Sequence, residues 1–279
     1  MTDKLRFRLN GSTALVTGGG GFLGPEHAIA LLAAGCQVVL ADISHEGCEA
    51  AKARISQEFS GDHPRCDAVV CDISDENQVR DLAEKLENSG MSPDILVNNA
   101  ALNPKMKQDH SDSVTGSVEG YSIEELRREI DVGLVGAFIC SKIFGSRMAE
   151  RKKGVLVHVA SDLAIQAPDQ RVYSPSGQME DVRNFKPIGY SLVKTGMLGL
   201  NRYLATYWAH CSVRSNCLIP GAVFNHQPAH LVENVKNRVP LRRWARPDEY
   251  REALVFLASS ASSYMTGKEI VLDGGRSIW

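Results

Sequence analysis

Short apolar runs alternate with longer segments of helical periodicity along almost the whole chain. The apolar runs predict seven strands, over residues 13–17, 37–41, 68–71, 94–98, 155–160, 213–219 and 270–272. Apolar residues spaced three and four apart predict helices over residues 25–34, 46–59, 76–88, 123–150 and 189–210. Strands that are nearly all apolar and alternate with helices are typical of a parallel sheet covered on both faces.

The expected fold is therefore α/β. No break in the pattern is long enough to mark a linker, so we expect one doubly wound, Rossmann-type domain over residues 1–279, with a seven-stranded parallel sheet in the order 3-2-1-4-5-6-7 and helices on both faces. Three segments exceed ordinary loop length, at about 102–121, 165–187 and 222–247. They follow the fourth, fifth and sixth predicted strands, at the edge where such sheets bind ligands, and are expected to form a substrate pocket.

Composition and charge exclude several other classes of protein. The formal net charge is -2 and the charges are scattered, which argues against a nucleic-acid surface or a polybasic membrane patch. No apolar run predicts a membrane span, and the polar start of the chain does not resemble a signal peptide. The 7 cysteines form no Cys-x-x-Cys pair, which favours buried thiols in a reducing, cytoplasmic setting.

A glycine-rich turn follows the first predicted strand. Consecutive glycines at 18–21 come before Phe22, Leu23 and Gly24, and the first predicted helix starts there. Glycines at this position allow a tight turn and close approach of the backbone to a pyrophosphate. The amino end of the helix then offers unpaired N–H groups and partial positive charge to the phosphates. The motif predicts a dinucleotide-binding turn.

Asp42 ends the second predicted strand, 24 residues after Gly18. A carboxylate there can accept hydrogen bonds from both ribose hydroxyls of NAD and would repel the 2′-phosphate of NADP. The residues that follow, Ile43, Ser44 and His45, include no Lys or Arg to bind that phosphate. We therefore expect NAD as the cofactor, and a cap for the next helix is the alternative role of Asp42.

Tyr190 and Lys194 are four residues apart in a predicted helix, so their side chains lie on one face. An ammonium group beside a phenol favours the phenolate and is expected to lower the pKa of the Tyr190 hydroxyl from its usual value of about 10. A hydroxyl with such a pKa can give or take a proton near neutral pH.

These motifs together resemble those of the short-chain dehydrogenase/reductase family, over nearly the whole chain. Asn98-Asn99-Ala100-Ala101 is similar to the family's Asn-Asn-Ala-Gly motif, Pro220-Gly221 to its turn beside the nicotinamide, and Leu272-Asp273-Gly274-Gly275 to its final strand. The resemblance implies that Ser161, Tyr190 and Lys194 are catalytic. It also implies cofactor contacts by Gly18, Gly21, Phe22, Leu23, Gly24, Asp42, Ile43, Asp72, Ile73, Asn98, Ala100, Tyr190, Lys194, Pro220, Gly221 and Val223.

Three features depart from the compact branch of this family. The glycines are spaced Gly18-x-x-Gly21-x-x-Gly24, as in the branch that acts on sugar nucleotides, and 29 residues separate Ser161 from Tyr190, about twice the usual number. Gly133 stands where the family has an asparagine that supports a water relay from the catalytic lysine. The sequence does not show which group replaces this asparagine. The segments 204–209, 220–227 and 245–250 are similar to bacterial oxidoreductases of flagellin modification and nonulosonic-type sugar biosynthesis.

The resemblance implies hydride transfer between nicotinamide and a carbinol or carbonyl carbon of a sugar or sugar derivative. Tyr190 would act as acid or base, Lys194 would lower its pKa and hold the nicotinamide ribose, and Ser161 would bind the substrate oxygen. An epimerase or dehydratase that retains its NAD, and a catalytically weak NAD-binding sensor or scaffold, remain alternatives. The substrate and the direction of the reaction stay open.

Polar residues in the three long loops are candidates for substrate binding: Asn103, Lys105, Lys107, Gln170, Arg171, Arg183, His226 and Gln227. No metal site is expected, because Pro228 separates His226 from His230 and argues against a shared helix. The resemblance implies a homodimer or homotetramer and leaves the choice between them open.

Overall fold

The strands form one all-parallel sheet in the order β3-β2-β1-β4-β5-β6-β7, which confirms the predicted fold class and strand order. The computed structural model describes residues 6–59, 64–103, 116–182 and 184–279. The strands are β1 (Thr13–Thr17), β2 (Gln37–Asp42), β3 (Cys66–Val70), β4 (Ile95–Asn98), β5 (Gly154–Val159), β6 (Val213–Pro220) and β7 (Glu269–Leu272). Each predicted strand is present, and no end differs from its predicted position by more than two residues.

The helices are α1 (Gly24–Ala33), α2 (His45–Glu58), α3 (Glu76–Asn88), α4 (Ile123–Ile130), α5 (Gly136–Glu150), α6 (Ile188–Tyr207), α7 (Ala229–Lys236) and α8 (Arg251–Ala258). The local sequence explains where several of these helices begin. Pro25 lies in the first turn of α1, and the Ser44 hydroxyl accepts a hydrogen bond from the Gly47 N–H at the start of α2. The Asp75 carboxylate caps α3 in the same way.

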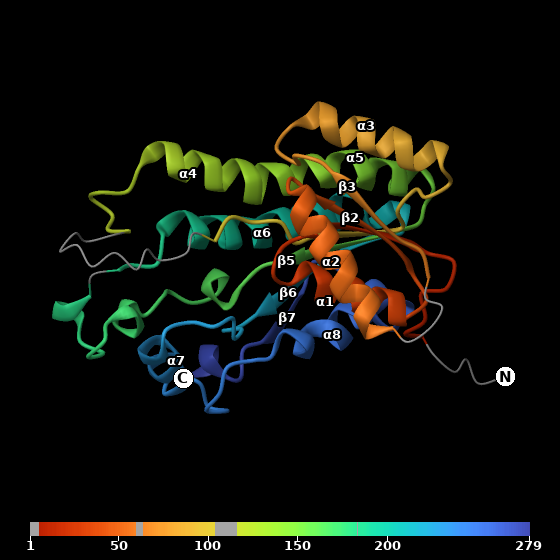
Figure 1. The fold of residues 1–279 in the computed structure, drawn as a ribbon. Coiled ribbons are helices and arrows are strands. Elements are labelled where there is room, and N and C mark those ends of the chain that lie inside the picture. Colours follow the sequence, from red (N-terminus) through yellow and green to blue (C-terminus); the bar gives the residue numbers. More distant parts are fainter. Residues whose placement is uncertain (1–5, 60–63, 104–115, 183) are drawn as a thin grey trace.

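The helices cover both faces of the sheet, and the alternation of side chains along the strands explains how. Ala14 and Val16 of β1 pack into the core under α1, α2 and α8, while Leu15 between them packs into the core under α3, α5 and α6. Figure 1 shows α3 and α5 along one side of the sheet and α1, α2 and α8 along the other. Apolar residues therefore occupy successive positions in the middle of β1, as the sequence pattern indicated.

Two helices lie where the sequence pattern predicted none. Both α7, inside the predicted loop 222–247, and α8 have only eight residues, which is too short for a clear periodic signal. Leu231 and Val235 of α7 bury one face against Val172, which belongs to the predicted loop 165–187. Two of the three predicted loops thus contain short helical segments that pack on each other.

The helical stretch Ile123–Glu150 is long and apolar enough to cross a membrane, contrary to the expectation from the sequence. The apolar window is 56% buried inside the fold, and core helices of globular proteins pass the same test. A π-helical turn, Asp131–Val135, joins α4 to α5 within this stretch and contains Gly133. Such turns interrupt the regular α-helical hydrogen bonds and occur often at functional sites.

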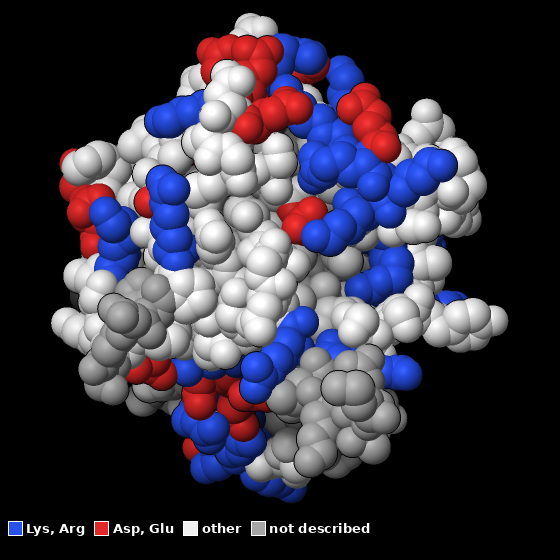
Figure 2. Space-filling view, turned by 90° about the vertical axis from the view of Figure 1, so that its right-hand side faces the viewer, with Lys and Arg blue, Asp and Glu red and all other residues white. Residues whose placement is uncertain are grey.

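The edge of the sheet at the amino ends of the strands carries charges of both signs. Arg151 and Lys153, around the start of β5, each form an ion pair with Asp94, which precedes β4. Figure 2 shows this edge of the molecule, with Lys and Arg next to Asp and Glu and a broad uncharged area between them. The cavity described below lies at the opposite edge.

Candidate active site

A large cavity lies along the carboxyl ends of the strands. Its volume is about 1510 Å³, and its walls come from the segments after β1, β2, β4, β5 and β6 and from the start of α6. Pockets for one small molecule usually measure roughly 300–1,000 Å³. The cavity is therefore large enough for a dinucleotide together with a substrate.

The glycine turn closes one end of this cavity and requires glycine at its first position. Gly18 has φ +62°, and a Cβ atom on it would lie 2.7 Å from the Cα atom of Ala100. The Asn99 side chain donates hydrogen bonds to the carbonyl oxygens of Thr17 and Gly18, each at 3.0 Å. These contacts hold the turn after β1 against the segment after β4, at the point where the strand order reverses.

Asp42 lies at the end of β2 beside this turn. Its Oδ2 atom accepts a hydrogen bond from the Gly20 N–H at 3.0 Å, and its Oδ1 atom accepts one from the Ser44 N–H at 2.9 Å. The carboxylate therefore orders both the glycine turn and the start of α2. Each oxygen keeps a further lone pair for a ligand hydroxyl in the cavity that Asp42 lines.

Most of the predicted cofactor residues line the cavity, and two do not. Asn98 is buried in the sheet, where its amide donates to the Ser141 hydroxyl at 2.9 Å and lies 3.2 Å from Nδ1 of His158. Gly24 starts α1 behind the turn. The predicted residues in the cavity wall are Gly18, Gly21, Phe22, Leu23, Asp42, Ile43, Asp72, Ile73, Ala100, Tyr190, Lys194, Pro220, Gly221 and Val223.

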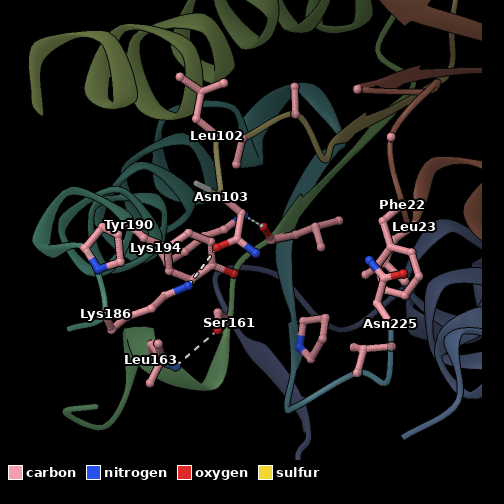
Figure 3. A pocket seen from close by; sticks show the side chains of 18 of the residues that line it. Phe22, Leu23, Leu102, Asn103, Ser161, Leu163, Lys186, Tyr190, Lys194 and Asn225 are labelled. Atoms are coloured by element: carbon pink, nitrogen blue, oxygen red, sulfur yellow. Dashed lines mark hydrogen bonds between the residues drawn. The ribbon is translucent and has the colours of Figure 1, made fainter. Parts of the chain in front are cut away.

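Ser161, Tyr190 and Lys194 meet at the other end of the cavity. Ser161 follows β5, and its hydroxyl accepts a hydrogen bond from the Leu163 N–H at 3.3 Å. The Tyr190 ring lies beside Ser161 in the first turn of α6, and Lys194 follows one turn later with its Nζ atom 5.7 Å from the ring centre. Figure 3 shows this group on one side of the cavity and Phe22 and Leu23 on the other.

The pKa of the Tyr190 hydroxyl does not follow the prediction from its spacing to Lys194. Burial raises this pKa to about 12, although the contact with Ser161 lowers it in part. The ammonium group of Lys194 donates to the Val159 carbonyl oxygen at 2.7 Å, and burial lowers its own pKa to about 8. Desolvation disfavours both charged forms, and it is the largest cause of the pKa shift of each group.

A buried ion pair next to Ser161 was not predicted from the sequence. The Asp162 carboxylate accepts a hydrogen bond from the Ser161 hydroxyl at 3.1 Å and lies 2.8 Å from Nη1 of Arg276. Arg276 follows the final glycine pair of the chain and lines the cavity. The adjacent Ser161-Asp162 sequence was a possible signal, but its basic partner is 114 residues away.

Lys186 is a second residue that the sequence analysis missed. Its Nζ atom lies 3.8 Å from the centre of the Tyr190 ring and donates a hydrogen bond to Oδ1 of Asn103 at 2.7 Å. Lys186, Tyr190 and Lys194 recur every four residues, which was the available signal. Because α6 begins only at Ile188, after Pro187, Lys186 reaches the ring from the preceding loop.

Gly133 faces α6 across a close contact. A Cβ atom on it would lie 2.5 Å from Cγ1 of Val193, the neighbour of Lys194. Gly133 is buried in the π-helical turn. An asparagine side chain does not fit at this position unless Val193 moves, so the packing of α6 against the π-helical turn accounts for the glycine.

The predicted substrate-binding residues fall into three groups. Asn103, His226 and Gln227 line the cavity. Gln170 instead accepts a hydrogen bond from the Lys186 N–H, and Arg171 forms an exposed ion pair with Asp169. Lys105, Lys107 and Arg183 lie outside the described residues.

Two curated relatives match almost the whole chain. D-Threitol dehydrogenase of Mycolicibacterium smegmatis is 30% identical over 98% of this chain and 95% of its own length. Galactitol 2-dehydrogenase of Rhizobium johnstonii is 31% identical over 100% of both chains.

Solved structures show the same architecture. A gluconate 5-dehydrogenase from Burkholderia cenocepacia, in complex with NADP and tartrate, has a TM-score of 0.80 and 25% identity over 98% of this chain and 97% of its own. A short-chain dehydrogenase from Leptospira borgpetersenii with bound NAD+ has a TM-score of 0.81 and 26% identity over 100% of this chain and 97% of its own.

Residues 23–277 match the family model described as enoyl-(acyl carrier protein) reductase. This match covers more than half of the chain, and its ends coincide with the glycine turn and the segment after β7. The chain therefore belongs to the short-chain dehydrogenase/reductase family of oxidoreductases, whose members bind a nicotinamide cofactor.

Proposed function

We propose that this oxidoreductase uses NAD to interconvert a secondary alcohol and a ketone on a polyol, sugar or sugar derivative. The observation that carries the proposal is the layout of one cavity. The glycine turn and Asp42 form one end, and Ser161, Tyr190 and Lys194 form the other. This layout suits a dinucleotide whose adenosine lies at Asp42 and whose nicotinamide reaches Tyr190.

The residues at the first end fit NAD better than NADP. Asp42 carries negative charge and retains free lone pairs, which favours ribose hydroxyls and disfavours a 2′-phosphate. The next two residues, Ile43 and Ser44, offer no positive charge. Gly18, Gly21 and the start of α1 would hold the pyrophosphate, and Asp72 would lie near the adenine.

The residues at the second end supply proton transfer and orientation. Ser161 would hydrogen-bond the substrate oxygen, since Asp162 and Leu163 already fix the position of its hydroxyl. Tyr190 would give a proton to that oxygen in reduction and take it in oxidation. Lys194, with its pKa near 8, would hold ribose hydroxyls and favour the phenolate form of Tyr190. The bound nicotinamide supplies the hydride chemistry.

The relatives narrow the class of substrate. The two curated relatives are named for threitol and galactitol, and one structural neighbour is named for gluconate. A hydroxylated carbon chain is therefore the proposed substrate. The resemblance to oxidoreductases of flagellin modification and nonulosonic-type sugar biosynthesis stays a narrower prediction, to be tested with sugar derivatives of that kind.

We also propose that residues 1–279 act as one domain in a cytoplasmic homodimer or homotetramer. The cysteines among the described residues are free, and five of them are buried. Large apolar side chains are exposed on α5 and α6, namely Phe138, Leu192, Tyr203 and Tyr207. Solution scattering would measure the oligomeric state, and a monomer would contradict this part of the proposal.

The central experiment measures absorbance at 340 nm with NAD+ or NADP+ and a panel of alditols, aldonates and sugar derivatives. We expect NADH to form, with NAD+ favoured over NADP+, and D42A to lose most of that preference. A retained-cofactor epimerase would convert the substrate without net absorbance change. NADH binding without turnover of any panel member would instead indicate a sensor or scaffold.

A further inference from the structure

Lys186 places a positive charge in the wall of the cavity, directly above the face of Tyr190. Its Nζ atom lies 3.8 Å from the ring centre, and Asn103 accepts a hydrogen bond from it at 2.7 Å. In Figure 3, Lys186 points from its loop toward Tyr190 and Asn103 and lies on the same side of the cavity as Lys194. Contact with the ring and with Asn103 thus holds the ammonium group at a defined position.

Among the described residues, Lys186 has no carboxylate in direct contact, although the negative charges of Asp162 and Glu129 act on it from farther away and raise its pKa in part. Within the described part of the chain, no Asp or Glu forms an ion pair with it, whereas Arg276 in the same wall is paired with Asp162. Glu129, a buried acid on α4, accepts a hydrogen bond from the Tyr121 hydroxyl at 2.6 Å and makes no ion pair with Lys186. Burial lowers the pKa of Lys186 to about 8, so the group is cationic at neutral pH and partly desolvated.

A partly desolvated cation whose direct contacts are all neutral gains most from an anionic ligand. The cavity offers that ligand a place beside Lys186, because Lys186, Ser161 and Tyr190 all line it. Lys194 adds a second positive charge on the same side but donates to the Val159 carbonyl oxygen. Of the two cations beside the Tyr190 ring, Lys186 is therefore the one available to a group on the substrate.

We propose that Lys186 binds an anionic group, a carboxylate or a phosphate, carried by the substrate close to its reacting carbinol. The substrate is then a hydroxy acid of the aldonate type or a polyol phosphate rather than a neutral polyol. Asn103 orients the ammonium group for this contact. The inference rests on the proposed function and names the substrate class of the same site.

A different role for Lys186 predicts a different result. If its charge served only to favour the phenolate of Tyr190, replacing it would shift the pH profile of turnover and leave the choice between anionic and neutral substrates unchanged. Binding of an anionic group instead predicts a change in that choice. The two roles are separated by comparing ligands that share one carbon chain.

The test measures binding of D-gluconate, D-glucitol 6-phosphate and D-glucitol to the enzyme–NADH complex by titration calorimetry at pH 7. We expect at least one anion to bind tenfold or more tightly than glucitol. The anion that binds more tightly shows whether the site prefers a carboxylate or a phosphate. K186M should reduce the preference to less than about threefold, and K186R should keep most of it.

The matched control is K142M, at an exposed lysine of α5 that pairs with Glu76 outside the cavity and should leave the preference as in the wild type. The inference is overturned if glucitol binds as tightly as both anions, if none of the three binds, or if K186M keeps the wild-type preference. The proposed function fails separately, if NADH does not bind or no alcohol is oxidised.

Discussion

Arg276, near the end of the chain, forms an ion pair with Asp162 at 2.8 Å, immediately after the proposed catalytic Ser161. The Arg276 side chain is only 11% exposed, and the Asp162 side chain is buried, at 4% exposure. The pair connects the segment after β7 to the end of β5, and Asp162 also accepts the hydrogen bond of the Ser161 hydroxyl. The terminal segment is thus part of the support of the site.

This pair gives the first prediction. R276M leaves the Asp162 carboxylate buried and unpaired, which should lower the free energy of unfolding by about 3–5 kcal/mol. The double variant D162N/R276M should recover part of the loss, because no charge remains buried. Urea unfolding measures both values. Equal stability of R276M and the wild type would show that water or another cation replaces the arginine.

The second prediction concerns Tyr190. Y190F removes the group proposed to transfer the proton and should lower kcat by about 10²–10⁴-fold, the usual range for loss of acid–base catalysis. NADH fluorescence should show nearly unchanged cofactor binding, because the ring still packs against Lys186. A variant that keeps most of its rate would contradict the assignment.

The third prediction concerns the contact between Gly133 and Val193. G133N forces Val193 to move and should destabilise the protein by about 1–3 kcal/mol, the typical cost of overpacking. It should also lower kcat, since Val193 is adjacent to Lys194. The double variant G133N/V193A lacks the methyl groups that collide with the new side chain, so it should be more stable than the sum of the two single changes in unfolding free energy predicts. If the two changes simply add, the contact with Val193 is not the cause of the instability.

The fourth prediction concerns pH. Burial lowers the pKa values of His27 and His158 to about 4, whereas unfolded histidine titrates near 6.5. The contribution of these neutral histidines to the free energy of unfolding is complete above pH 6.5. It is lost as the pH falls toward 4, because only the unfolded chain takes up protons in that range. At pH 5.5, each histidine should lower the free energy of unfolding by about 1 kcal/mol relative to pH 7.

Denaturant unfolding between pH 7 and pH 5 measures this loss, and H27L is the matched variant. An apolar side chain at position 27 does not titrate, so the decline should be shallower than in the wild type. Parallel curves for the two proteins would show that His27 takes up its proton in the folded state.

The site was predictable where short motifs stand at the ends of strands. The glycine turn, Asp42, Ser161 and Pro220-Gly221 each lie at or just after the end of a strand, and parallel strands bring their carboxyl ends to one edge. The prediction for Asn98 was less accurate, because the side chain that holds the glycine turn in place belongs to its neighbour Asn99. The short helices α7 and α8 gave too few residues for a periodic pattern.

The sequence by itself determined the α/β class, the strand order and the positions of the motifs, because these depend on local periodicity and on the rules for connecting parallel strands. Only the tertiary structure decided the proton affinity of Tyr190, the placement of Lys186 above its ring and the pairing of Arg276 with Asp162. Desolvation and charge pairing depend on which distant segments exclude water from a group, and spacing along the chain does not contain that information.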